Sequence, residues 1–412
     1  MPERIGALDF VRGVAVLGIL AINVTGFWGP LLATFSPAMP RLEPGGAVWF
    51  AAAYVLFEGK MRGLFTLLFG ASMMLFADAA ERRGANPDLM QVRRLLLLMA
   101  FGYAHYALLW WGDILLPYAV CGMLAFSLRR LAPEPLAAAA LLLFLASHGL
   151  EIFGDLASIA AENRVLAGHG SPAEVADQTA MMGRIAASIT ADMQVLHAPF
   201  FGAVRIRLTT APFLPLANLG ATFFETFPLM LLGMALLRLG LFTGEWEDGS
   251  LHRMALFGIG MGGAVSAGLI GWAALQGFPP AMMFALMGSL AAIPHLAMTL
   301  GYLAVLLLLY PRLKDTPTGQ RLVAAGRCAF TNYLGTTFVM SALFAGWSLG
   351  LGGVLPRAAL PLMVLGGWAL MLAWPQLWLA RFGQGPLEAL WRKLTWLGVP
   401  CSPTIPPADG AA

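Results

Sequence analysis

RRLLLLMAFGYAHYALLWWGDILLPYAVCGMLAFSLRR, residues 93–130, is an apolar run long enough to cross a lipid bilayer twice. Two arginines flank it at each end, and a turn at residues 110–113 interrupts it. Two ionisable residues, His105 and Asp113, lie inside the run. An ionisable group at membrane depth costs about 3 kcal/mol or more, so each needs a polar partner or a functional role. The stretch therefore predicts a membrane hairpin with a polar site near its turn.

The composition of the whole chain agrees with a membrane location. The 412 residues are 59% hydrophobic and 11% charged, with a mean hydropathy of +0.74, whereas a soluble domain carries about 25% charged residues. These values predict an all-α polytopic protein whose main partner is the lipid bilayer. The net charge of +3 is too small to indicate a nucleic-acid partner. The three cysteines imply no disulfide framework, and no metal-ligand spacing occurs, so no metal is expected.

Apolar segments extend along the chain and predict a single transmembrane domain, residues 1–398, followed by a disordered Pro-rich tail, 399–412. About ten spans are expected, and GKMRG in the middle of the second one predicts a broken helix. The expected spans are 13–34, 47–79, 93–111, 113–130, 135–153, 213–240, 254–276, 285–310, 326–347 and 359–380.

Basic residues alternate between the loops that these spans define. With the N-terminus in the cytoplasm, the inside loops are rich in arginine and lysine, and the outside loops 35–46, 277–284 and 348–358 are poor in them. The positive-inside rule therefore predicts an N-in, C-in topology. The one long connection, residues 154–212, is then outside. It is either a functional segment or a solvated linker, and residues 176–196 have helical spacing typical of a surface helix or a cavity cap.

The first span carries three polar residues. Asp9 and Arg12 are three residues apart and share a helix face. Asn23 follows eleven residues after Arg12, about 16 Å deeper along a helix. Its amide either bonds a neighbouring helix or donates to a substrate carbonyl or developing oxyanion.

The second span carries three charges within five residues, Glu58, Lys60 and Arg62. These charges either pair with one another and hold the helix break, or line a site for an anionic group such as a phosphate or a thioester carbonyl.

A histidine titrates near neutral pH, so His105 is a candidate general base. Eight residues of straight helix would separate it from Asp113 by about 12 Å, so a direct bond requires that the turn fold back or that a water bridge the two. The alternative is a structural histidine with satisfied hydrogen bonds. His295 is a second candidate base or substrate ligand. Arg327 and Asn332, near the inner end of a span, are positioned for a cytosolic phosphate-bearing donor or for helix capping.

Five stretches together resemble one family. They are LDFVRGVAVLGILAINV, FEGKMRGLFTLLFGAS, HYALLWWGDILLPYAVCG, AGRCAFTNYL and FGQGPLEALWRKLTW. They occur in order from the first span to the tail, and they are similar to the bacterial DUF418 (YeiB-like) family. This family is grouped with the transmembrane acyltransferases, which include the lysosomal heparan-α-glucosaminide N-acetyltransferase.

The resemblance implies a multi-pass enzyme of the bacterial inner (cytoplasmic) membrane. It would take an acyl group, acetyl in the family's known case, from cytosolic acyl-CoA and deliver it to an acceptor on the far side, a sugar or glycan. The DxxRG…N pattern of the lysosomal enzyme carries the active-site asparagine over to Asn23. The essential histidine that follows it there has no counterpart in FWGPLLATFSPAMP, so His105 takes its place.

The sequence hypothesis therefore assigns His105 as general base, Asp113 as its orienting partner and Asn23 as the oxyanion donor. Substrate and donor binding falls to a second set of polar residues, with the arginines and the lysine among them holding the acyl-CoA phosphates. This set contains Arg12, Glu58, Lys60, Arg62, Arg94, His295, Arg327 and Asn332. The alternative is a transporter for a small polar solute that uses the same buried charges. A homo-oligomer is left open.

Overall fold

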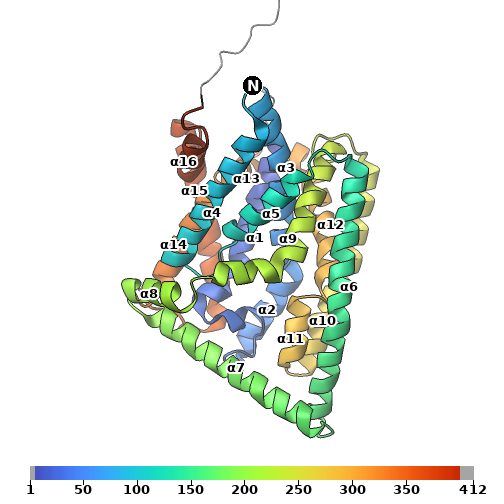
Figure 1. Ribbon diagram of the computed structural model, residues 1–412, viewed down its shortest axis with the longest axis vertical. Coiled ribbons are helices and arrows are strands. Elements are labelled where there is room, and N and C mark those ends of the chain that lie inside the picture. Colours follow the sequence, from blue (N-terminus) through green and yellow to red (C-terminus); the bar gives the residue numbers. More distant parts are fainter. Residues whose placement is uncertain (1–4, 400–412) are drawn as a thin grey trace, which may run out of the picture.

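Residues 5–399 are described by a computed structural model, and every regular element in this range is a helix (Figure 1). The expected disordered tail falls, apart from Val399, outside the described residues. In chain order the helices are α1 (Gly6–Trp28), η1 (Leu31–Thr34), α2 (Pro44–Leu56), α3 (Lys60–Glu81), α4 (Pro87–Leu108), α5 (Leu115–Ser127), α6 (Pro133–Leu166), α7 (Pro172–His197), α8 (Phe200–Thr210), α9 (Leu214–Arg238), α10 (Asp248–Leu275), α11 (Pro280–Met287), α12 (Ala292–Leu313), α13 (Pro317–Arg327), α14 (Ala329–Phe344), η2 (Arg357–Ala359), α15 (Leu360–Phe382) and α16 (Pro386–Thr395).

Seven helical segments of the described chain are long and apolar enough to cross a membrane, which supports the all-helical membrane class. The predicted spans 93–111, 113–130 and 326–347 fall on α4, α5 and α14, which are not among the seven. Helix α5 has 13 residues and extends about 20 Å, less than the bilayer core of about 30 Å. The count of about ten crossings therefore stays a prediction.

Helix α1 is the centre of the bundle. In its apolar window 72% of the residues are buried, against 22% in α6 and in α10. It packs against α3, α13, α14 and α15. Gly13 permits the closest of these contacts, because a Cβ there would overlap the backbone of Leu322 in α13. The first and last parts of the chain therefore build the core together, and α6 and α10 turn most of their surface toward lipid.

The predicted break in the second span is confirmed. Helix α2 ends at Leu56 and α3 starts at Lys60. Gly59 between them has φ 74°, a conformation that favours glycine. A Cβ at this position would also overlap the His295 imidazole of α12. The break thus brings the FEGKMRG charges against α12.

The predicted outer connection, residues 154–212, is mostly helical and is no irregular linker. Helix α6 continues to Leu166, and α7 and α8 follow. Residues 176–196 are helical as expected. Ser171 and Glu174 form a capping box at the start of α7. Figure 1 shows α7 as a diagonal strut at the end of the molecule away from the N-terminus. Near its far end, Asp192 accepts a hydrogen bond from the backbone N–H of Leu31, and burial raises the pKa of this carboxyl group.

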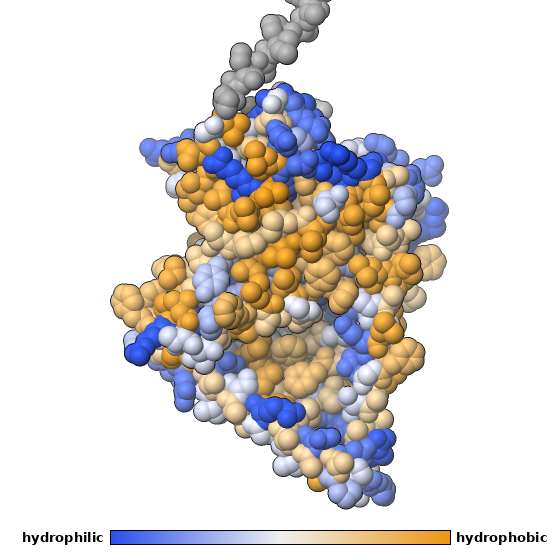
Figure 2. Space-filling model, viewed as in Figure 1, coloured by the Kyte–Doolittle hydropathy of each residue, from blue (hydrophilic) through white to orange (hydrophobic). Residues whose placement is uncertain are grey.

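Both ends of the described chain lie at the same end of the molecule (Figure 1). On the face seen in Figure 2, hydrophilic residues gather at the two ends and apolar residues cover the middle. This distribution fits a protein embedded in a bilayer. Which end faces the cytoplasm stays a prediction from the loop charges.

Candidate functional site

The turn after α4 folds back and brings His105 and Asp113 into direct contact. His105 Nδ1 lies 2.9 Å from Asp113 Oδ1, and both side chains are 0% exposed. The other carboxylate oxygen accepts the backbone N–H of Leu116, 2.9 Å away, in the first turn of α5. An ionised Asp113 fixes the proton on Nδ1 and leaves Nε2 as an acceptor. Of the two routes that the sequence left open, the direct bond is the one observed.

Gly102, one turn before His105, makes this contact possible. A Cβ at position 102 would lie 2.7 Å from Asp113 Oδ2 and 2.5 Å from the backbone nitrogen of Leu116. Any side chain there would push the turn away from α4. The glycine in the GYAHY stretch is therefore a packing requirement of the His105–Asp113 pair.

His105 Nε2 is buried and has no hydrogen-bond partner within the described chain. The ring next to it belongs to Tyr333 of α14, with ring centroids 5.2 Å apart. The Tyr333 hydroxyl donates to the carbonyl oxygen of Gly112, 3.1 Å away. An unpaired buried nitrogen has lost its hydration without gaining a protein partner, which is uncommon for a purely structural histidine.

The tryptophan pair at the turn attaches the hairpin to α1. Trp110 Nε1 donates to the carbonyl oxygen of Gly26 at 3.1 Å, and its ring lies 4.1 Å from that of Phe27. Asn23 lies one turn of α1 before these residues. Trp110 thus packs against α1 one turn beyond Asn23.

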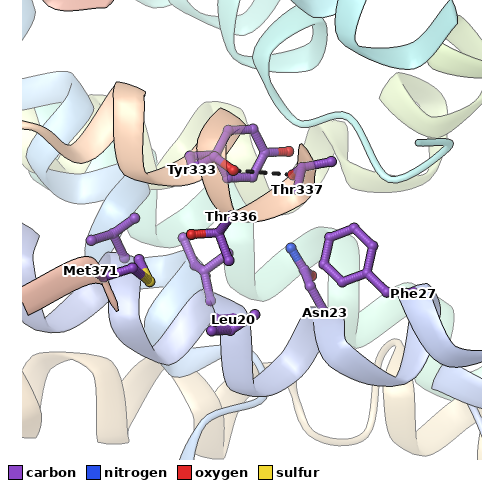
Figure 3. A pocket seen from close by; sticks show the side chains of 9 residues that line it. Leu20, Asn23, Phe27, Tyr333, Thr336, Thr337 and Met371 are labelled. Carbon is purple, nitrogen blue, oxygen red and sulfur yellow. Dashed lines mark hydrogen bonds between the residues drawn. The ribbon is translucent and has the colours of Figure 1, made fainter. Parts of the chain in front are cut away.

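Asn23 points into a small pocket between α1, α14 and α15, as Figure 3 shows. The pocket has a volume of about 10 Å³. Among the described residues, no side chain or backbone group hydrogen-bonds to the Asn23 amide. Of the alternatives for this residue, a hydrogen bond to a neighbouring helix is absent from the described structure, and the amide is free to donate to a ligand.

A much larger cavity opens at the end of the molecule where the two ends of the described chain lie. Its volume is about 580 Å³, within the common range of about 300–1,000 Å³ for ligand sites. Helices α1, α3, α4, α5, α13, α14 and α16 line it, and its lining includes Leu115, Tyr118 and Tyr333. Six arginines line this space, which we call the arginine cavity: Arg12, Arg82, Arg83, Arg94, Arg327 and Arg392.

Two of these arginines have unpaired donors. The guanidinium group of Arg94 lies between the rings of Phe76 and Trp391, 4.7 and 4.6 Å from their centroids. Its Nη1 is buried and has no partner in the described chain. The same holds for Nε of Arg327, although its Nη2 donates to Gly383. The cavity thus presents fixed and uncompensated positive charge, which suits an anionic ligand.

Arg12 is compensated. Its Nη1 donates to Asp9 at 2.9 Å, as their spacing predicted, and its Nη2 donates to Ser72. Across the cavity, Glu388 of α16 accepts three hydrogen bonds from the first turn of α14, including the backbone N–H of Phe330. This carboxylate anchors α16 over the cavity, a role that the sequence did not reveal.

The charges near the helix break form a separate group, which we call the break cluster: Glu58, Lys60, Arg62, Glu225 and His295. Arg62 forms a bidentate pair with Glu225 of α9, at 3.0 and 2.9 Å, and contacts Glu58 at 3.4 Å. Lys60 is 0% exposed and donates to the Tyr54 carbonyl oxygen. None of the five lines the arginine cavity. Glu58 and Arg62 therefore pair with each other, as one of the two alternatives predicted. Lys60 and Arg62 do not line the cavity that contains Arg94 and Arg327.

The last two predicted site residues, His295 and Asn332, differ in whether their polar atoms have partners. His295 has a buried, unpaired Nε2 and packs against the ring of Tyr54. Asn332 donates to the backbone of Ala325 and accepts from Trp374 Nε1, so it holds helices together and does not line the cavity. Its neighbour Tyr333 faces the site instead, and a helical wheel alone does not show which of two adjacent residues points inward.

Three comparisons with known proteins bear on the family. Residues 236–398 match the family model described as "Protein of unknown function (DUF418)". The chain is 29% identical to the uncharacterized protein YxaH of Bacillus subtilis over 96% of this chain and 95% of that protein. It is also 29% identical to the uncharacterized protein YeiB of Escherichia coli, over 95% of this chain and 96% of that protein.

A third relative, an uncharacterized 39.9 kDa protein of Bacillus acidopullulyticus, is 35% identical but covers 38% of this chain and 43% of its own length. No solved structure matches the chain. Residues 236–398 are thus similar to the DUF418 family, and two relatives are similar to this chain along nearly its whole length.

Proposed function

We propose that the protein is a membrane acyltransferase. It moves a short acyl group, acetyl in the simplest case, from acyl-CoA to a hydroxyl or amine of an acceptor, a sugar or glycan, at the opposite membrane face. The observation that carries the proposal is the arginine cavity, which leads from the charged end of the molecule to Tyr333, directly beside the His105–Asp113 pair.

The cavity matches the chemistry of the donor. Coenzyme A carries several phosphate charges and a flat adenine ring at one end and a thioester at the other. Arg94 and Arg327 offer unpaired donors for phosphate oxygens. Trp391 and Trp396 line the same region and offer aromatic faces for the adenine ring. The inner end is apolar apart from two tyrosines and suits the thioester arm. In this proposal the arginine end faces the cytoplasm of a bacterium, which agrees with the topology predicted from loop charges.

The reaction assigns one task to each polar group of the inner site. The acceptor oxygen or nitrogen attacks the thioester carbonyl carbon, and His105 Nε2 takes the acceptor proton. Asp113 holds the imidazole through Nδ1 and stabilises the imidazolium that forms. Asn23 donates to the developing oxyanion. The C–S bond then breaks, and the coenzyme A thiolate leaves and takes the proton from His105. Because the Tyr333 ring separates His105 from the cavity, this side chain must turn before the thioester reaches Nε2.

The decisive experiment measures coenzyme A release from acetyl-CoA by purified protein in detergent. His105→Ala removes the base, and His105→Asn keeps a donor toward Asp113 in the place of Nδ1 while removing Nε2. Both variants should bind coenzyme A like the wild type and release it at least about 100-fold more slowly, the usual contribution of a general base. His252→Ala, a change at an exposed histidine of α10, is the matched control and should behave as wild type.

Unchanged release by His105→Asn would remove His105 from the reaction. Absence of any acyl-CoA binding at millimolar concentration would refute the acyltransferase. Solute uptake into liposomes without acyl-CoA consumption would then support the transporter alternative.

A further inference from the structure

Tyr333 is a shared wall between two cavities. Its side chain lines the inner end of the arginine cavity and also lines the small pocket around Asn23. Its hydroxyl donates a hydrogen bond to the Gly112 carbonyl oxygen, and its ring lies against that of His105. A rotation of this one side chain would therefore connect the arginine cavity with the Asn23 pocket.

The Asn23 pocket combines one polar side with an apolar remainder. Figure 3 shows Asn23 and Leu20 on one helix, α1, with Thr336 of α14 pointing toward the same space and Met371 of α15 beside Thr336. Thr337 donates its hydroxyl to the Tyr333 carbonyl oxygen, 3.1 Å away, and so faces the backbone of α14. A volume of about 10 Å³ is close to the smallest that holds one water molecule, and a methyl group is of similar size.

We propose that the Asn23 pocket is the acyl-group subsite of the arginine cavity and that Leu20 and Met371 limit the acyl chain to about two carbons. The inference rests on the proposed function and adds the determinant of chain length. The thioester carbonyl oxygen accepts the unpaired N–H of Asn23, and the acyl methyl group occupies the space beside Leu20 and Met371. A longer chain meets the Met371 side chain, which lines the pocket and is 1% exposed to solvent.

The test follows coenzyme A release from acetyl-, butyryl- and octanoyl-CoA. Each methylene that a pocket cannot accommodate changes kcat/KM by about 10- to 200-fold, so the wild type should prefer acetyl over butyryl by at least about tenfold. Met371→Ala should lower or reverse this preference by raising butyryl transfer, and Leu20→Val should do so to a smaller extent. Met283→Ala is the matched control, because Met283 is equally buried but lies in α11, away from the pocket.

The outcomes separate this inference from the proposed function. If acetyl-CoA is turned over but Met371→Ala and Leu20→Val keep the wild-type chain-length preference, the subsite is elsewhere and the acyltransferase stands. If the wild type releases coenzyme A equally from all three donors, no short-chain pocket operates. If no donor is turned over, both proposals fail. Leu20→Val removes a single carbon and so tests the inference even if Met371→Ala does not fold.

Discussion

The break cluster and the arginine cavity both contain cations inside apolar helices, but they differ in how these charges are compensated. In the break cluster, Arg62 is held by two carboxylates. In the arginine cavity, Arg94 is held by two aromatic rings and keeps an unpaired donor. Paired charges fix a structure, whereas a positioned and unpaired charge is available to a ligand. In the proposed function, the same type of residue thus serves stability in one region and binding in the other.

The largest effect is expected from separating the bidentate pair of the break cluster. Glu225→Leu leaves the Arg62 charge inside the bundle with only the longer contact to Glu58. The pair is partly buried, and the variant loses two hydrogen bonds between charged groups, which together contribute about 3 kcal/mol. Thermal unfolding in detergent measures this loss. The double variant Arg62→Met/Glu225→Leu should recover part of it, because the Arg62 charge is then removed together with its bidentate partner, and only Glu58 loses its longer contact. A double variant as unstable as the single one would contradict the pairing argument.

A smaller effect, on binding rather than on stability, is expected for Arg94→Met. Methionine keeps apolar bulk between Phe76 and Trp391 but removes the charge. A hydrogen bond to a charged group contributes about 1.5–2 kcal/mol, so the dissociation constant for coenzyme A should rise about 10- to 30-fold. Isothermal titration calorimetry measures it, with Arg253→Met, at an exposed arginine of α10, as control. Equal affinity in Arg94→Met and wild type would show that the cavity charge is not used for this ligand.

The smallest effect concerns Tyr118, which joins the two regions. Its ring lines the arginine cavity, and its hydroxyl bonds to Thr66 and to the backbone of Arg62. Tyr118→Phe should cost about 1 kcal/mol of stability through the lost hydrogen bonds and leave coenzyme A binding within about twofold of wild type. A large loss of binding would mean that the two regions act as one site.

The sequence indicated elements that depend on local pattern. The apolar runs predicted the membrane class, the GKMRG stretch predicted the break before α3, and the turn after α4 was expected to hold a polar pair. The membrane class follows from hydropathy and the break from glycine in an apolar segment. The polar pair follows from two ionisable residues close to one turn of an apolar run.

Features that depend on tertiary packing were missed. Glu225 lies 163 positions from Arg62, and Glu388 lies 58 positions from Phe330. Nothing in the local sequence pairs them. Tyr333 was passed over for its neighbour Asn332, because the rotation of α14 about its axis is set by α1 and α15. Lys60 and Arg62 lie outside the cavity for the same reason, because the packing of α3 against its neighbours decides which of its residues face the cavity.

The anchoring of α16 by Glu388 has a consequence for biosynthesis. Among the described helices, α1, which supplies Arg12 and Asn23, leaves the ribosome first, and α16, which supplies Trp391 and Arg392, leaves it last. The arginine cavity is therefore incomplete until α16 has been synthesised and has packed against the rest of the bundle. A chain interrupted after α15 would still carry the seven described helical segments that are long and apolar enough to cross a membrane, but its cavity would lack the wall that α16 provides.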